Sequence, residues 1–280
     1  MRYAHILSRV TGEPWLITEP GGSAVVSLLN SRLATEPLPH VMQAPLPPPP
    51  PRPLLPPRPA TGLAVVRARG ILGKNLGSME MMCGGLDVDT LLNEIEGLLM
   101  APEIGTVAMH LDSPGGAATG IPEAHQRLVR LRAQYGKPLL AVVDGLCASA
   151  AMYLAAACDS IACTRTAQLG SIGAVTHLRF RVGMNAAEGL EVRTYKYGKF
   201  KDLGNPNRLP TPEEDAIMQE RINTLGRMFE SDMRSARPQM KDEVYDALVY
   251  FGEQAVALGL ADELTDSVED YLATIAKANV

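Results

Sequence analysis

Three glycine-containing turns each follow a predicted strand and offer hydroxyls or backbone amides for chemistry. They are Ser113-Pro114-Gly115-Gly116, the stretch from Gly145 to Ser149, and Gly170-Ser171-Ile172-Gly173. In an α/β sheet, binding and catalytic groups collect where the carboxyl ends of strands meet the following loops. Each turn taken alone is more typical of a simple connection than of a site.

Ser149 is the most specific candidate for a nucleophile in these turns. It follows an apolar strand and begins an alanine-rich helix, so its hydroxyl would lie at a helix N-terminus, where backbone amides can stabilise a developing oxyanion. The neighbouring Ala148, Ala150 and Ala151 are small and leave room for a substrate backbone. The competing interpretation is a serine that only caps a close-packed helix.

A serine nucleophile needs a base, and the sequence offers lysines rather than histidines for that role. None of the five histidines lies in a glycine-punctuated turn or in a capping position. A lysine can serve once burial or nearby cations favour its neutral form. The segment YKYGKFKDLGNP supplies Lys196, Lys199 and Lys201, and the residues alone leave the choice among them open.

These candidates need a scaffold of alternating strands and helices, which the sequence predicts from residue 62 onward. Strands are expected at 62–72, 106–112, 139–144 and 160–164, with helices capped by Asp89 and at 120–135 and 147–158. The 139–144 run is apolar until its end, which is typical of a strand buried in a parallel sheet. The alternation predicts an α/β domain.

A helix start at Thr211-Pro212-Glu213-Glu214 opens the C-terminal part of the chain. Thr211 would be the N-cap and Glu214 its partner in a capping box. Apolar residues then recur every three or four positions as far as Met233, which predicts a long amphipathic helix ending before Pro238. Such a helix packs on its own domain or contacts another subunit.

Composition and charge narrow the class of protein. The chain has 280 residues, 46% of them hydrophobic, and a net charge of −5 without a basic tract, so a nucleic-acid partner is not expected.

We expect no signal peptide, and the most membrane-like stretch, Gly145 to Cys158, is too short to span a bilayer. The four cysteines form no C-x-x-C pair and are expected to be free thiols.

Proline is concentrated in one place, because ten of the 22 prolines fall between Pro45 and Pro59. Proline fixes φ and removes a donor, so this stretch is expected to be a semi-rigid polyproline spacer, or else a proline-rich ligand for a partner. We therefore expect a docking or propeptide-like segment at 1–44, a linker at 45–61, the main domain at 62–272 and a tail at 273–280.

Five motifs together resemble the SppA-type serine peptidases. They are a strand ending in D-SPGG, then GLCASAAMYLAAACDSI, LGSIGAV, GKFKDLGNP and the ending VYFGEQAVALGLADEL. Within that family the chain is most similar to the lambda-type head maturation proteases of tailed phages. KDLGNPNRLPTPEED, RMFESDM and EPWLITEP carry this narrower resemblance.

The resemblance implies a fold and a catalytic pair. The fold is a ClpP/crotonase-like spiral of βα units with a C-terminal helical extension. Ser149 would be the nucleophile and Lys201 the general base of a Ser/Lys dyad. No metal, nucleotide or other cofactor is implied, and a homo-oligomer is expected because family members enclose their sites in rings.

The resemblance also assigns supporting groups around the dyad. The amide of Gly116, with Gly115 as the second choice, would form the oxyanion hole together with the amide of Ala150. Ser171 would help to orient the lysine. One departure is visible: many family members have Gly-Gly where this chain has Ala150-Ala151.

The expected activity is a phage prohead protease that cleaves scaffold, portal or capsid proteins, or its own chain. It would act in the host cytoplasm or the prohead interior, with no membrane or nucleic-acid partner. Three alternatives stay open: a bacterial signal-peptide-peptidase-like protease, a crotonase-fold enzyme acting on acyl-CoA, and a non-catalytic capsid assembly factor.

Overall fold

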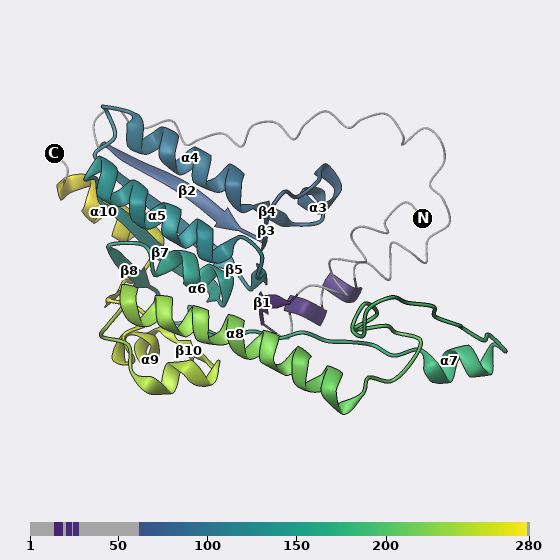
Figure 1. Ribbon diagram of the computed structural model, residues 1–280. Helices are drawn as coiled ribbons and strands as arrows, with labels where there is room; N and C mark the ends of the chain where they lie inside the picture. Colours follow the sequence, from purple (N-terminus) through teal and green to yellow (C-terminus); the bar gives the residue numbers. More distant parts are fainter. Residues whose placement is uncertain (1–13, 19–20, 24, 28–61, 279–280) are drawn as a thin grey trace.

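The computed structural model describes residues 14–18, 21–23, 25–27 and 62–278 (Figure 1). The linker expected at 45–61 and most of the N-terminal segment lie outside these residues. The domain boundaries therefore remain a prediction, although the last helix runs continuously across the boundary expected between 272 and 273.

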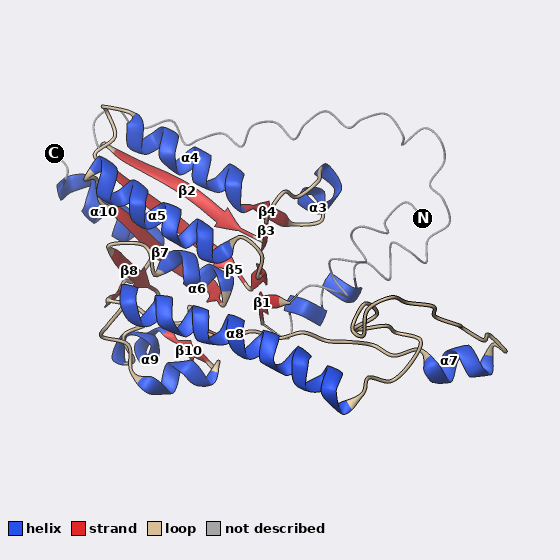
Figure 2. Ribbon diagram, in the orientation of Figure 1, coloured by secondary structure: helices blue, strands red, loops and turns tan. Residues whose placement is uncertain are grey.

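A seven-stranded sheet forms the centre of the domain (Figure 2). Its strands are β2 (Leu63–Arg69), β5 (Thr106–Ser113), β7 (Leu139–Ala148), β8 (Ser160–Cys163), β9 (Gln168–Gly170), β10 (Val249–Phe251) and β11 (Glu263–Leu264). Every pair in it is parallel except β10 with β9. The sheet confirms the predicted α/β class. Its four longest strands lie at the predicted positions, although the strand expected at 62–72 ends at Arg69, and Ile71 begins a strand of a second sheet.

Helices cover both faces of this sheet, as Figures 1 and 2 show. They are α3 (Ser78–Met82), α4 (Val88–Met100), α5 (Ile121–Tyr135), α6 (Ala150–Ala155), α7 (Val182–Ala187), α8 (Pro212–Ala236), α9 (Gly252–Ala257) and α10 (Val268–Ala278), with a 3-10 helix at Asp242–Asp246. Within the described residues, none of them is long and apolar enough to cross a bilayer.

The central strands are apolar on both sides because each side meets a layer of helix. Side chains alternate between the faces of a strand. On β7, Ala141 and Val143 therefore pack into the main core with α4 and α5. Leu140 and Val142 point the other way and pack against Tyr271 of α10. This arrangement explains the unbroken apolar run of the strand.

A smaller sheet holds the first of the three glycine turns. Its strands, in spatial order, are β1 (Trp15–Ile17), β6 (Gly115–Ala117), β3 (Ile71–Gly73) and β4 (Gly85–Asp87). β6 is parallel to β3 and antiparallel to β1. The N-terminal segment is thus joined to the domain through the strand that contains Gly115-Gly116.

Two local predictions were wrong. The N-cap of α4 is Asp87 rather than Asp89, because β4 runs directly into the helix and the Asp87 carboxylate accepts from Thr90 N over 2.9 Å. The helix expected at 147–158 is only α6, because β7 continues to Ala148 before the chain turns.

Two other local predictions are confirmed. Thr211 and Glu214 form the capping box that starts α8, and the helix ends before Pro238. Cys83, Cys147, Cys158 and Cys163 are all free thiols, and burial raises the pKa of Cys158 to about 12.

Candidate active site

The three glycine-containing turns meet at one edge of the main sheet, as their position after parallel strands predicts. Ser113, the last residue of β5, lies opposite Cys147 of β7. On the other side of β7, Ala148 lies opposite Gly170 of β9. Ser149 N then donates to Gly170 O over 2.8 Å, which joins the second turn to the third.

Ser149 has a backbone conformation that suits a displayed nucleophile. It connects β7 to α6 with φ 54 and ψ −116, a left-handed φ that is uncommon for a residue with a side chain. Strain of this kind persists only where surrounding structure imposes it, and it clusters at active sites. A serine on a sharp strand-to-helix turn is the geometry of known nucleophile elbows.

The Ser149 hydroxyl is buried and unpartnered. The residue is 1% exposed, and its Oγ has no hydrogen-bond partner among the described residues. It also makes no capping hydrogen bond to the first turn of α6. The interpretation of Ser149 as a simple helix cap is therefore wrong, and the hydroxyl is available for another task.

The residues expected to form the oxyanion hole lie around this turn. Ala150 is the first residue of α6, so its amide is one of the N–H groups without a partner inside the helix. Gly115 and Gly116 are buried in β6, and a Cβ at Gly116 would come within 1.8 Å of Leu72 O. Only glycine fits there, which keeps the backbone of β6 close to its neighbours.

Ser171 lies directly after the residue that pairs with Ala148. It has a φ of 55, and its amide donates to Leu248 O over 2.7 Å. Within the described residues, neither Ser149 nor Ser171 is hydrogen-bonded to Lys201. The expected role of Ser171 in orienting the lysine therefore stays a prediction.

Lys201 lies on a separate feature, which we call the arm and define as residues 174–211. From 173 to 213 no residue is buried. Figure 1 shows the arm, with α7, projecting beyond the N-terminal end of α8. Lys201 is exposed in a turn of this arm, and its amide donates to Gly198 O over 3.2 Å. The described chain does not bring its ammonium group to the Ser149 hydroxyl.

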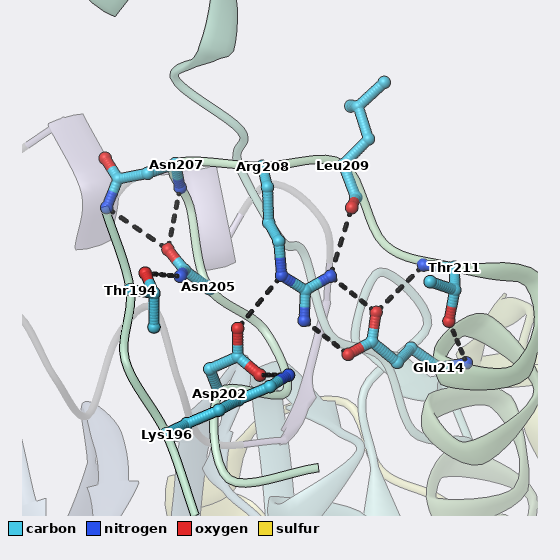
Figure 3. Close-up of polar contacts among 9 residues, drawn as sticks. All are labelled: Thr194, Lys196, Asp202, Asn205, Asn207, Arg208, Leu209, Thr211 and Glu214. Atoms are coloured by element: carbon cyan, nitrogen blue, oxygen red, sulfur yellow. Dashed lines mark hydrogen bonds and ion pairs between the residues drawn. The ribbon is translucent and has the colours of Figure 1, made fainter. Parts of the chain in front are cut away.

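The three candidate lysines of the arm differ in their contacts. Lys196 is paired with Asp202 (Figure 3), and Lys199 Nζ lies 2.5 Å from a carboxylate oxygen of Glu213. Lys201 forms no ion pair or side-chain hydrogen bond with any residue that the structure describes. Two of the three ammonium groups are thus engaged by carboxylates, and the third is available.

A network of charges ties the turn that contains Lys201 to the start of α8 (Figure 3). Arg208 donates through Nε to Asp202 over 3.0 Å and through both terminal nitrogens to Glu214, over 2.6 and 2.5 Å. The Arg208 guanidinium holds the pKa of the Glu214 carboxyl down to about 2 and the pKa of Asp202 below its usual range. Both carboxylates are therefore charged at neutral pH.

The far end of α8 is packed on the helix that Ser149 begins. The Phe229 ring stacks on the Tyr153 ring with centroids 4.3 Å apart, and Tyr153 OH donates to Asp232. Behind them, His125 Nδ1 lies 2.8 Å from Tyr153 O. The helix therefore contacts the arm at one end and the nucleophile helix at the other.

Sequence reasoning missed two parts of this site. The first is the network of Asp202, Arg208 and Glu214, for which the capping box at Thr211 was the only local signal. The second is β1, because no spacing rule indicates that it pairs with the Gly115-Gly116 strand. In the described part of the chain, no group of three or more His, Cys, Asp and Glu side chains is placed to hold a metal.

Comparison with known protein families matches residues 132–280 to the family described as Peptidase family S49. The chain is 31% identical to the head-tail preconnector protein GP5 of Enterobacteria phage P21, over 80% of this chain and 45% of that protein. It is 27% identical to the capsid assembly protease C of Escherichia phage lambda, over 74% of this chain and 47% of that protein. The chain thus spans about half the length of these relatives.

Among solved structures, the chain is similar to an enoyl-CoA hydratase/isomerase family member, with a TM-score of 0.40 and 17% identity. The match covers 79% of this chain and 73% of that one.

Proposed function

Because the chain belongs to peptidase family S49, we propose that it is a serine endopeptidase with Ser149 as its nucleophile. The conformation of Ser149 carries this proposal. Its φ is 54 on a strand-to-helix turn, and its hydroxyl is buried with no partner in the described residues. A hydroxyl held this way at a cost in stability is suited to a reaction rather than to the fold.

The proposed reaction is acyl transfer to serine followed by hydrolysis. Ser149 Oγ attacks the carbonyl carbon of a peptide bond while Lys201 Nζ takes the hydroxyl proton. The amides of Gly116 and Ala150 donate to the oxyanion that forms. Lys201 then gives the proton to the leaving amine, and a water molecule, deprotonated by the same lysine, releases the acyl group.

The contacts of the arm support Lys201 over the other two lysines as the base. Lys196 and Lys199 are each paired with a carboxylate, whereas Lys201 has no such partner in the described residues. A base must be free to give up its proton and to approach the hydroxyl. The choice that the family resemblance implies and the contacts of the arm therefore agree.

We further propose that the dyad is completed between two copies of the chain. Large apolar side chains of the arm are exposed: Val182, Met184, Leu190, Val192, Tyr195, Tyr197, Phe200 and Leu209. An exposed apolar surface of this kind is typical of a protein interface. The arm of one subunit would cover the site of its neighbour and place Lys201 beside that neighbour's Ser149.

Mixing two inactive variants tests this arrangement. Subunits carrying Ser149→Ala and subunits carrying Lys201→Ala are unfolded together, refolded and assayed for cleavage of casein. If Lys201 acts on a neighbour, mixed assemblies recover part of the wild-type rate. If each lysine serves its own chain, the mixture stays inactive, and the two-subunit site is refuted.

The proposed substrates are the scaffold, portal or capsid proteins of a tailed phage, cleaved inside the prohead, and the chain itself. Support comes from the relatives, since one is named a capsid assembly protease and another a head-tail preconnector protein. Co-expression with the capsid, scaffold and portal proteins of the same genome provides the test. Defined products that disappear in Ser149→Ala are expected, and products that persist there would refute the proposal.

A further inference from the structure

The N-terminal strand β1 lies between two parts of the proposed site. On one side it pairs with β6, where Leu16 lies opposite Gly116. On the other side, Trp15 N donates to Val175 O over 2.9 Å and Val175 N donates to Trp15 O over 3.0 Å. β1 therefore connects the glycine-rich strand of the oxyanion hole to the segment that follows the third glycine turn.

The register brings β1 to the proposed oxyanion donor itself. Thr18 N donates to Pro114 O over 2.9 Å at one end of the ladder. Hydrogen-bonded pairs alternate along an antiparallel ladder, so the next such pair is Leu16 with Gly116. The Gly116 amide then faces the Leu16 carbonyl, which is where the carbonyl of a peptide substrate would have to lie.

An extended peptide that reached this site would compete with β1 for the same backbone groups. Peptides commonly bind proteins by adding a strand to a sheet edge. Here that edge is taken, because Leu16 is 2% exposed and Ile17 is 6% exposed, and the nearby Ser149 is 1% exposed. The presence of β1 thus explains both the burial of the Ser149 hydroxyl and the occupied edge of β6.

We propose that β1 occupies the position of a substrate strand and inhibits the site until it is displaced. The inhibitory role of β1 rests on the peptidase function proposed above. Whether β1 occupies the substrate edge can be tested without catalysis. β1 spans only three residues, and residues 18–62 connect it to β2. A strand this short on a long connection can leave without disturbing the seven-stranded sheet.

Binding of a free peptide tests whether the edge is occupied. The probe is a fluorescent peptide EPWLITEP, the sequence of residues 13–20, measured by anisotropy against two full-length proteins. One carries Ser149→Ala alone, and the other carries Ser149→Ala with Leu16→Pro. Proline removes the Leu16 amide from the ladder and is disfavoured inside a strand.

The peptide should bind the Leu16→Pro protein about tenfold more tightly, which corresponds to about 1.4 kcal/mol, near the net worth of one hydrogen bond. A control peptide, EPWPITEP, should bind neither protein. Equal affinity for both proteins, or no binding to either, would show that β1 is a permanent strand and would overturn the proposal. Thr18→Pro, which removes the donor to Pro114, is the second variant should Leu16→Pro not fold.

Catalysis gives an independent readout that separates the two proposals. With Ser149 intact, Leu16→Pro should raise the rate of casein cleavage about tenfold, the same factor as the binding change. An active wild type with an unchanged Leu16→Pro rate contradicts inhibition by β1. No Ser149-dependent cleavage by either protein contradicts the peptidase function, while peptide binding still decides the position of β1.

Discussion

Replacing Ser149 by alanine should stabilise the protein while it removes the proposed activity. The Ser149 hydroxyl is buried and has no partner among the described residues. Burying a hydroxyl without a hydrogen bond costs about 1–3 kcal/mol by protein mutational data. Alanine keeps the backbone and its positive φ, so the free energy of unfolding should rise by up to about that amount.

A second buried serine provides a matched control with the opposite sign. Ser113 is 0% exposed, and its Oγ accepts from Gly115 N over 3.2 Å. Ser113→Ala leaves that amide buried without its partner, so the free energy of unfolding should fall by about 1–3 kcal/mol. The same substitution at two neighbouring strand ends should therefore shift stability in opposite directions.

Thermal and urea unfolding of the two variants provide the measurement. For a domain of this size, each kcal/mol shifts Tm by about 2–4 °C. A Ser149→Ala protein that unfolds at or below the wild-type temperature would refute the reasoning, because the hydroxyl must then have a partner in solution. Persistent casein cleavage by this variant would refute Ser149 as the nucleophile.

Two further predictions concern the helix that joins the arm to the site. Glu214→Gln breaks the paired contact with Arg208, and the arm should then be misplaced. We expect kcat for casein to fall by about a hundredfold, with KM little changed. The same change at Glu220, on the exposed face of α8, should leave kcat unaltered. Burial lowers the pKa of His125 in the folded protein, so between that lowered pKa and about pH 6.5 the unfolded chain binds a proton that the folded protein does not. Stability should therefore fall by up to about 1.4 kcal/mol per pH unit as the pH drops through this window. His125→Gln, which keeps a donor for Tyr153 O, should flatten this slope in urea titrations between about pH 5 and 8, and an unchanged slope would assign it to another group.

The position of the glycine turns could be predicted because it follows from local rules. Parallel strands end at one edge of a sheet, so three turns that follow such strands must come together there. The pairing of Ser113 with Cys147 and of Ala148 with Gly170 is the result. The capping box of α8 was equally predictable, since it depends on residues three positions apart.

The arm and β1 could not be predicted in the same way, because both depend on contacts between residues distant in the sequence. The local pattern of residues 173–213 does not show which surface this segment contacts, although no residue in it is buried. The pairing of Leu16 with Gly116 joins residues on opposite sides of the proline-rich stretch. Only the folded chain reveals such register.

Labelling with a serine-directed fluorophosphonate tests the central claim most directly. Mass spectrometry after digestion should find the adduct on Ser149 in the wild-type protein and in Lys199→Ala, formed at similar rates. Lys201→Ala should form the same adduct far more slowly, because the hydroxyl then lacks its base. An adduct on another serine, or equal labelling rates in all three proteins, would contradict the Ser149–Lys201 dyad.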